Sequence, residues 1–317
     1  MKPQELVTIS VIMPAFNSED TVGEAIQSVI AQTYTNLELI IVDDGSSDKT
    51  CQAIEAFADR RIKLIKHDRN KGQGAARNTA IAAASGDWIT LIDADDFWAR
   101  ERLEKLLEPT KYLGSRVMVA DDILEFYQTS EGIKPWRRVW KRQIRFDEET
   151  TKISLARYLS FERTVMQPLV PLQAIIEHNI LYPVVSIAED LEFYIRLMKT
   201  ARLDLKFIDF PGYYYRRTPG SISTHPQRYI LAKKVLLDIL EDINFTDKEK
   251  SAIHTKIEKL NQNIEYMYFL DALRNREISK LLKLSISRPR NLLEFSKRIP
   301  ATLNYRFQVL INKGSSR

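Results

Sequence analysis

The sequence of 317 residues contains a single cysteine, Cys51, so no disulfide can form within the chain. This absence excludes a disulfide-stabilised scaffold and is typical of the reducing cytoplasm. No run of about 18 apolar residues occurs, so we predict no transmembrane helix. The apolar residues 9–16 follow Glu5 instead of a basic segment and precede no small-residue cleavage site, so we interpret them as a buried strand.

Glycine and proline are also sparse, with 10 and 12 residues, and no repeat or low-complexity segment is present. Collagen-like and disordered chains are thereby excluded. The 44% of hydrophobic and 28% of charged residues are typical of a globular protein that is long enough to bury a large core. The net charge of +5 is small, and we expect no nucleic-acid partner.

The N-terminal third of the chain alternates between short apolar runs and stretches with helical spacing. This alternation predicts an α/β fold with a mostly parallel, Rossmann-like sheet flanked by helices. The pattern then changes to shorter strands mixed with aromatic and basic residues, which indicates a second half with a mixed sheet. The expected strands are residues 7–13, 37–42, 62–66, 88–92, 117–120, 123–127, 136–141, 205–210 and 213–216, with a late helix at 188–199.

We expect one domain over residues 1–225, with a nucleotide-binding half at 1–113 and an acceptor-side half at 114–225. A helical extension follows at 226–317, supported by an apolar stripe at Leu231, Val235, Leu236, Ile239 and Leu240. Residues 278–317 carry nine Lys or Arg against one acid, with apolar residues interleaved. This segment fits binding to an anionic membrane surface at the inner face of the cell membrane, and a solvated helical face explains the same pattern.

Polar residues follow each of the first four expected strands. Because ligands bind beyond the carboxyl ends of parallel strands, we expect these residues to form one rim. In chain order they are Pro14-Ala-Phe-Asn17, Asp43-Asp-Gly-Ser-Ser-Asp48, Asn70-Lys-Gly-Gln-Gly-Ala-Ala-Arg77 and Asp93-Ala-Asp-Asp96.

Three carboxylates in this rim, Asp93, Asp95 and Asp96, fall within four residues. Like charges this close repel each other, and a divalent cation between them relieves the repulsion. Oxygen ligands favour Mg²⁺ or Mn²⁺, and Mg²⁺ commonly binds one or two carboxylates together with substrate phosphates. The alternative is that these aspartates cap the following helix.

Two other parts of the rim allow both a binding and a structural interpretation. Asp43 and Asp44 stand where a carboxylate can bind a nucleoside, and they also fit an ordinary Asp-Asp-Gly-Ser turn. The helix that begins near Gly74 presents N–H groups that can hold a diphosphate, with Arg77 as a further donor. Pairing of Arg77 with a carboxylate is the alternative. A dinucleotide fingerprint is excluded, because it belongs after the first strand and needs a glycine where Arg77 stands.

Five ordered motifs carry a resemblance to a known family. They are Ile9-Ser-Val-Ile-Met-Pro-Ala-Phe-Asn17, Ile40-Ile-Val-Asp-Asp-Gly-Ser-Ser-Asp48, Gly74-Ala-Ala-Arg-Asn78, Ala84-Ser-Gly-Asp-Trp-Ile89 and Leu91-Ile-Asp-Ala-Asp-Asp96. With them the sequence resembles the family 2 inverting glycosyltransferases of GT-A fold, in particular bacterial enzymes of exopolysaccharide and lipopolysaccharide synthesis. The match is strong over residues 7–110 and extends weakly to residue 225.

The resemblance implies a donor site. Asp44 would accept the uracil N3–H, and Asp43 would support that loop. Asp95 would bind the cation that bridges the diphosphate. The remaining donor-side roles, lining the nucleoside pocket or contacting the donor sugar, ribose or phosphates, would fall to Pro14, Ala15, Asn17, Glu19, Arg77, Asp93 and Asp96.

The resemblance also implies a catalytic base and a closing loop in the second half. Glu189 and Asp190 match an acidic pair of the family, and Asp190 would be the base; without that resemblance the pair favours a helix N-terminus. Arg216 and Arg217 would reach the donor phosphates. His225 would supply a further metal ligand, with a solvent-facing histidine as the alternative.

These expectations describe a metal-dependent, inverting glycosyltransferase that moves a sugar from a nucleotide sugar, in the first place a UDP-sugar, to a saccharide or polyprenyl-diphosphate-linked glycan. Processive members of this family share a Gln-x-x-Arg-Trp motif and membrane spans, and neither is found in this sequence, so the resemblance implies single additions. Two alternatives stay open. A sugar nucleotidyltransferase shares the α/β layout but needs a glycine-rich signature after the first strand, and a degenerate, non-catalytic carbohydrate or membrane adaptor shares the whole fold.

Overall fold

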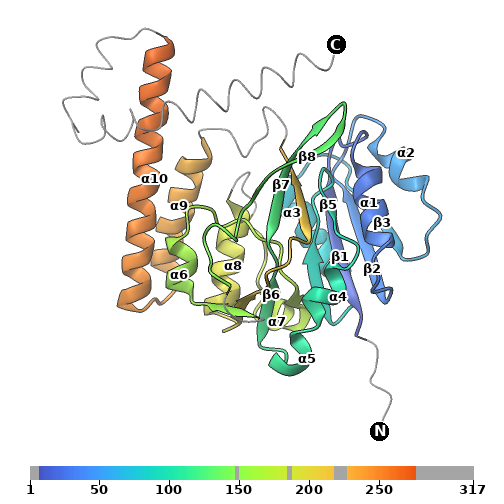
Figure 1. Cartoon of the computed structure of the whole chain (residues 1–317), viewed down its shortest axis with the longest axis horizontal. Coiled ribbons are helices and arrows are strands. Elements are labelled where there is room, and N and C mark those ends of the chain that lie inside the picture. The colour runs from blue at the N-terminus through green and yellow to red at the C-terminus, as the bar shows by residue number, and fades with distance from the viewer. Residues whose placement is uncertain (1–6, 147–149, 184–187, 218–226, 276–317) are drawn as a thin grey trace. The chain divides into compact units, whose positions relative to one another are not determined.

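A computed structural model describes residues 7–146, 150–183, 188–217 and 227–275 of the chain (Figure 1). The chain divides into two compact units. The first comprises the residues up to Phe126 together with Pro135–Arg216. The second comprises Tyr127–Lys134 and the residues from Arg217 onward, so the division falls a few residues before the expected boundary at 225.

The first unit is built on a five-stranded sheet with the order β10-β4-β1-β2-β3. Its strands are β1 (Ile9–Ala15), β2 (Leu37–Asp43), β3 (Ile62–Lys66), β4 (Trp88–Leu91) and β10 (Val170–Pro171). The pairs β4–β1, β1–β2 and β2–β3 are parallel, and β10 is antiparallel to β4. The expected mostly parallel α/β sheet is confirmed. β1 and β2 are mostly apolar, apart from Ser10, Glu38 and Asp43, because both of their faces are largely buried.

Helices connect these strands as the sequence spacing predicts. α1 (Val22–Ile30) buries an apolar face, and α2 (Thr50–Glu55) follows the polar turn after β2. α3 (Gln73–Ala83) packs on β1 and β2 through small residues. Gly74 in its first turn leaves no room for a Cβ, which would lie 2.5 Å from the carbonyl oxygen of Pro183.

Two smaller sheets have the orders β6-β11-β9 and β5-β12-β7-β8. Their strands belong to the first unit except for residues 127–134, which include the end of β7 and the start of β8. Both contain parallel and antiparallel pairs, so the expected mixed sheet is present. Their strands are β5 (Phe97–Trp98), β6 (Val117–Ala120), β7 (Ile123–Thr129), β8 (Gly132–Arg138), β9 (Thr151–Ile153), β11 (Asp204–Phe207) and β12 (Tyr213–Arg216). The accompanying helices are α4 (Arg102–Leu107), α5 (Thr110–Leu113), α6 (Leu155–Ser160), α7 (Leu172–Glu177) and α8 (Glu189–Lys199).

The strand expected at residues 136–141 is displaced. The observed strand β8 begins at Gly132 and ends at Arg138. The chain leaves the sheet where the Trp140 N–H donates to Asp122 Oδ1 at 2.6 Å and its ring becomes fully buried. An apolar anchor that leaves the sheet has the same local composition as a strand, so the sequence pattern did not separate the two.

A buried ion pair ties α4 to the end of β6. Arg102 donates from Nε and Nη2 to the two oxygens of Asp121, at 2.9 and 2.8 Å, and its guanidinium lies 4.4 Å from the ring centre of Trp98. Neither side chain is more than 2% exposed. Removing one partner from such a pair leaves the other charge desolvated and unpaired.

We therefore expect Arg102→Ala to lower the free energy of unfolding by about 3–5 kcal/mol. Urea unfolding followed by circular dichroism measures the change. Lys66→Ala is the matched control, because the pair of Lys66 with Glu55 is more than half exposed and screened by solvent, so its loss should change the free energy of unfolding much less. Equal losses in the two variants would show that burial does not govern the contribution of Arg102.

The second unit contains α9 (Gln227–Asp242) and α10 (Asp247–Arg274), which pack against each other. Val235, Leu236 and Ile239 of the expected apolar stripe are buried in α9. None of the helices in the described residues is long and apolar enough to cross a membrane. The basic segment 278–317 lies outside the described residues.

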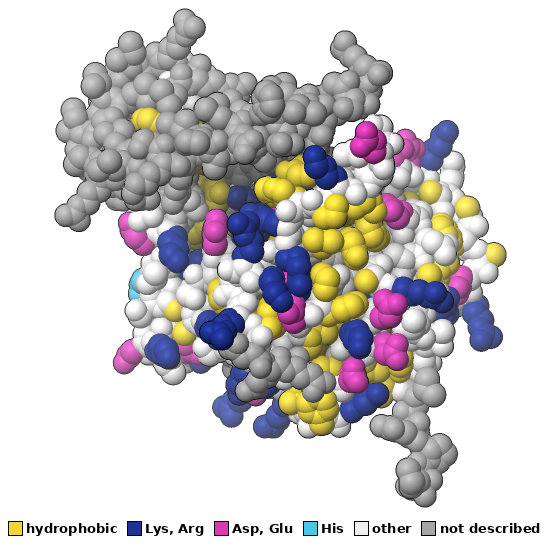
Figure 2. Space-filling view, viewed as in Figure 1, with side chains coloured by type: hydrophobic (Ala, Val, Ile, Leu, Met, Phe, Trp, Pro, Cys, Tyr) yellow, Lys and Arg dark blue, Asp and Glu magenta, His cyan; other side chains and the backbone are white. Residues whose placement is uncertain are grey.

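Surface charge in the described residues is mixed. On the face viewed in Figure 2, Lys and Arg side chains lie among acidic and apolar side chains. Since nine basic residues and one acid fall in 278–317 while the whole chain has a net charge of +5, the remainder of the chain is slightly acidic.

Candidate active site

The loops after β1 and β2 form one edge of the candidate site. The two strands are parallel and in register to their last residues, so their carboxyl ends meet. Across this edge the Ser47 N–H donates to Asn17 Oδ1 at 2.9 Å, and the Lys49 N–H donates to Glu19 Oε2 at 2.8 Å. Pro14 and Ala15, at the end of β1, are buried, whereas Asn17 and Glu19 are exposed. The structure thus brings Pro14, Ala15, Asn17 and Glu19 together.

Asp44 is the centre of a hydrogen-bond network that fixes the loop before α3. Its Oδ1 lies 2.6 Å from His67 Nδ1 and accepts the Lys71 N–H at 2.9 Å, while its Oδ2 accepts the Gly72 N–H at 2.8 Å. The carboxylate is only 4% exposed. Asp43 accepts the Ser46 N–H at 3.2 Å. Both aspartates therefore support loops, which is the role that the family resemblance implied for Asp43 and the structural alternative for Asp44.

Residues 93–96, here called the aspartate loop, follow β4 at the same edge of the sheet. The Tyr213 hydroxyl from β12 accepts the Asp93 N–H at 3.1 Å and donates to Asp96 Oδ2 at 2.8 Å. Arg216 N–H donates to Asp96 Oδ1 at 2.7 Å, and Arg216 Nε donates to the Asp95 carbonyl oxygen at 2.8 Å. The Asp96 carboxylate is thus buried and satisfied by protein donors, whereas Asp95 is exposed.

The electrostatics of the aspartate loop favour a cation. Although the residue is solvent-accessible, desolvation by the protein atoms around its carboxyl, followed by the charge of Asp93, raises the pKa of Asp95 to about 6. Burial and the charges of Asp95 and Asp93 raise the pKa of Asp96 well above its usual range. No group of three or more His, Cys, Asp or Glu arranged around one point occurs in the described residues. The oxygen of a single exposed carboxylate is nevertheless the kind of ligand that Mg²⁺ or Mn²⁺ takes together with substrate phosphates.

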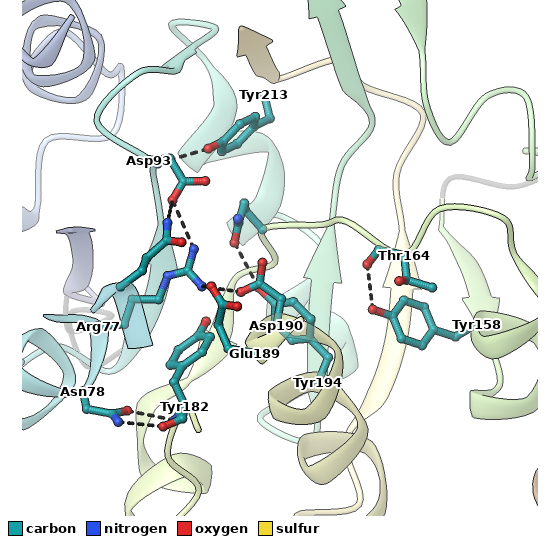
Figure 3. Close-up of polar contacts among 12 residues, drawn as sticks. Arg77, Asn78, Asp93, Tyr158, Thr164, Tyr182, Glu189, Asp190, Tyr194 and Tyr213 are labelled. Carbon is teal, nitrogen blue, oxygen red and sulfur yellow. Dashed lines mark hydrogen bonds and ion pairs between the residues drawn. The ribbon is translucent and has the colours of Figure 1, made fainter. Parts of the chain in front are cut away.

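Arg77 of α3 connects the aspartate loop to the first turn of α8 (Figure 3). Its Nη1 donates to Asp190 Oδ1 at 2.6 Å and to Glu189 Oε1 at 3.1 Å, and its Nη2 donates to Asp93 Oδ1 at 3.2 Å. Pairing with carboxylates, the structural alternative for Arg77, is therefore what the structure shows. The three partners are residues that the sequence assigned to the site.

Asp190 has a strongly perturbed environment. Burial raises the pKa of its carboxyl to about 7 against the opposing effect of Arg77, and the charges of Glu189 and Asp93 act in the same direction as burial. Its side chain is 26% exposed, so a partner can approach it. Ala188, directly before α8, has φ +70°, a left-handed conformation that costs a non-glycine residue about 1–2 kcal/mol. Strain of this kind is characteristic of functional sites.

The three site residues predicted after α8 are Arg216, Arg217 and His225, and the structure describes the first two. Arg216 contacts the aspartate loop as described, and its Nη2 also pairs with Glu24 of α1. Arg217 is half-buried and belongs to the second unit. His225 lies outside the described residues.

Three residues that hold the site together were missed from the sequence. Tyr213 bridges Asp93 and Asp96, Gln73 Nε2 donates to Asp93 Oδ1 at 3.0 Å, and Asn78 exchanges hydrogen bonds with the backbone of Tyr182 at 2.8 Å in both directions. Asn78 closes the Gly74-Ala-Ala-Arg-Asn78 motif, and Tyr213 begins an aromatic run beside Arg216. Their positions next to predicted site residues are the sequence signals from which Asn78 and Tyr213 could have been predicted.

A parallel sheet with an aspartate loop at its carboxyl edge, completed by a mixed sheet and an acidic helix N-terminus, defines a GT-A fold. Residues 10–166 match the family model described as glycosyl transferase family 2. The chain therefore carries a glycosyltransferase domain of family 2.

Part of the chain is similar in sequence to a protein of known name. It is 47% identical over 96 residues to the UDP-Glc:alpha-D-GlcNAc-diphosphoundecaprenol beta-1,3-glucosyltransferase WfgD of Escherichia coli, a match that covers 30% of the chain and 38% of that protein. The chain thus spans about two fifths of the length of the curated relatives it matches first.

Two solved structures share the fold at low sequence identity. The S. aureus TarS 1-349 structure in complex with UDP-GlcNAc aligns with a TM-score of 0.63 at 20% identity, over 87% of this chain and 79% of that one. The mannosyltransferase PcManGT from Pyrobaculum calidifontis, in complex with GDP-Man and Mn2+, aligns with a TM-score of 0.61 at 16% identity, over 98% of this chain and 85% of that one.

Proposed function

We propose that the chain is an inverting, divalent-metal-dependent glycosyltransferase that adds one sugar from a UDP-sugar to a polyprenyl-diphosphate-linked glycan in surface polysaccharide synthesis. The observation that carries the proposal is the placement of Asp190. A carboxyl group with a raised pKa and a partly exposed side chain is joined through Arg77 to the aspartate loop at the carboxyl edge of the sheet. A base beside a phosphate-binding edge is what inverting transfer requires.

The proposed reaction follows from these positions. Asp190 removes the proton of the acceptor hydroxyl as that oxygen attacks C1 of the donor sugar from the face opposite the diphosphate. The new C–O bond forms while the bond from C1 to the diphosphate oxygen breaks, which inverts the configuration at C1. Asp95 would hold the Mg²⁺ or Mn²⁺ ion, which when bound stabilises the charge on the leaving diphosphate. Asp93 would contact the donor, whereas Asp96, whose two carboxylate oxygens accept from Tyr213 and Arg216, orients the aspartate loop instead of the donor.

The loops after β1 and β2 would bind the nucleoside. Pro14 and Ala15 form the floor, Asn17 and Glu19 the exposed edge, and Asp43 and Asp44 hold the loops that shape it. UDP is the proposed nucleotide because the name of WfgD specifies UDP-Glc and TarS binds UDP-GlcNAc. The lipid-linked acceptor in the name of WfgD supports the proposed acceptor class and a location at the cytoplasmic face of the membrane.

A thermal-shift panel of UDP-, GDP- and dTDP-sugars, each with and without Mn²⁺, tests the proposal. A UDP-sugar with Mn²⁺ at about 100 times its dissociation constant should stabilise the folded protein by about 2.7 kcal/mol. UDP-sugar alone should give a smaller shift, and Mn²⁺ alone little. A metal-independent shift with all three donors, or a shift with none, would contradict the proposed donor site. Release of pyrophosphate from a nucleoside triphosphate would support a nucleotidyltransferase in its place.

A further inference from the structure

We propose that Arg77 is a positioning residue for the base: its guanidinium holds one oxygen of Asp190 and ties that carboxylate to Asp93 of the aspartate loop. The inference rests on the proposed function, since it gives Arg77 a part in the same reaction. It differs from the expected role of Arg77, which was direct contact with the donor sugar or phosphates.

The contacts of Arg77 differ from those of a stabilising ion pair. Arg102, equally buried, directs its fork at the single carboxylate of Asp121. Arg77 is 2% exposed and divides its fork between two segments, with Nη1 on the first turn of α8 and Nη2 on the aspartate loop. Burying a guanidinium costs several kcal/mol unless it is paired, so its three acidic partners are the condition for its burial. A planar fork can join two carboxylates at fixed angles, which a lysine cannot do.

The pairing with Arg77 makes the two carboxylate oxygens of Asp190 different, because only one of them is hydrogen-bonded within the part of the chain that the structure describes. Oδ1 accepts from Arg77 Nη1 at 2.6 Å, and in the described residues no hydrogen bond to Oδ2 is found. A carboxylate anchored through one oxygen presents the other in a defined direction. The anchored oxygen therefore fixes the rotation of the carboxylate, and Oδ2 is the oxygen that receives the acceptor proton.

Neighbouring residues hold Arg77 itself in place. Its guanidinium lies 5.0 Å from the ring centre of Tyr182, whose backbone exchanges two hydrogen bonds with Asn78 of the same helix. Close contact of Gly74 with Pro183 brings α3 against this segment. The motif Gly74-Ala-Ala-Arg-Asn78 thus builds a rigid support, and a support of this kind is what keeps a reacting group in its productive geometry.

The charges around Asp190 are unbalanced. One guanidinium faces three carboxyl groups, those of Asp93, Glu189 and Asp190, and burial opposes ionisation of Asp190. The positive charge of Arg77 acts against burial at Asp190 and favours the ionised base by lowering its pKa. The titratable and charged groups around Asp190 are Arg77, Glu189, Asp93, Tyr158, Tyr182 and Tyr194.

Two variants test the inference, one removing the charge and one removing only the fork. In Arg77→Gln, the pKa of Asp190 should rise by about 1–3 units, the usual effect of losing an opposite charge at this range. Carbon-13 NMR titration of the protein labelled at Asp carboxyls measures it, with Asp190→Asn assigning the signal. In Arg77→Lys the charge stays, and kcat should fall at least about tenfold because the orientation is lost, while the dissociation constant for UDP is unchanged. Arg196→Gln, on the same helix, should alter neither quantity.

The outcomes separate the inference from the proposed function. A folded Arg77→Gln variant with an unchanged Asp190 titration would overturn the inference, as would wild-type kcat in Arg77→Lys. Should Arg77→Gln not fold, Arg77→Lys decides through its kcat measured against UDP binding. If the wild-type protein transfers no sugar but the Asp190 titration moves as expected, the proposed function fails while the link between Arg77 and Asp190 stands.

Discussion

Asp190→Asn is expected to lower kcat for sugar transfer about 10²- to 10⁴-fold, the usual contribution of a positioned general base. Asparagine has nearly the same shape and cannot accept the acceptor's proton. Its side chain can still hydrogen-bond Arg77, so α8 and the donor site should stay folded. The measurement is the rate of UDP release from a UDP-sugar in the presence of a lipid-linked acceptor.

The control for this loss is Glu192→Gln, on the same helix and paired with Arg196 at 2.8 Å. It should keep wild-type kcat. UDP binding should be equal in the two variants and the wild type. If Asp190→Asn retained full transfer, or if Glu192→Gln lost as much, Asp190 would not be the base.

The same base predicts the pH dependence of the wild-type rate. Transfer requires the ionised carboxylate, and burial raises the pKa of Asp190 to about 7. The rate should therefore be full above this pH and fall as the pH decreases through about 7, because the carboxylate becomes protonated. A profile that stays flat down to the ordinary range of aspartate, near pH 4, would show that no buried carboxyl acts as the base.

Asp95→Asn is expected to lower kcat about 10²- to 10³-fold, the loss that follows removal of one group stabilising the leaving charge. The amide is neutral and is a weak ligand for Mg²⁺ or Mn²⁺ compared with a carboxylate. The thermal shift that a UDP-sugar gains from added Mn²⁺ should disappear as well. Calorimetric titration of the variant with UDP and Mn²⁺ measures this loss directly.

Asp204→Asn is the matched control for Asp95, because Asp204 lies on β11 and forms an exposed ion pair with Lys152. It should keep both the rate and the metal-dependent shift. Unchanged UDP binding by Asp95→Asn in the presence of Mn²⁺ would refute the assignment of the cation to Asp95.

The parallel half of the fold was readable from local pattern. β1 and β2 are apolar runs bounded by turn residues, and α1 and α3 between the strands have helical spacing. The mixed half was less readable. β10 contains two residues, and its second is the proline Pro171, so it carries no periodic signal. It is a strand through its antiparallel pairing with β4, which is distant in the sequence.

The candidate site likewise has a part that the sequence pattern predicts and a part that depends on contacts distant in sequence. Each of the polar loops follows its own strand, so parallel topology alone places Asn17, Asp44 and Asp95 at one edge of the sheet. The link from Arg77 to Asp190 joins residues 113 positions apart. No local pattern encodes a contact over that separation.

By itself, then, the sequence determined the parallel sheet, the rim at its carboxyl edge and the identity of the acidic residues, because hydrophobic periodicity and turn chemistry are local properties. Only the tertiary structure decided which of those residues stay exposed for a ligand and which are buried or paired within the protein. It left Asp95 exposed while Tyr213 and Arg216 bury Asp96, and it turned Arg77 toward carboxylates. The physical reason is that burial and ion pairing depend on which distant segments pack together, and these terms set the charge, the orientation and the pKa of each side chain.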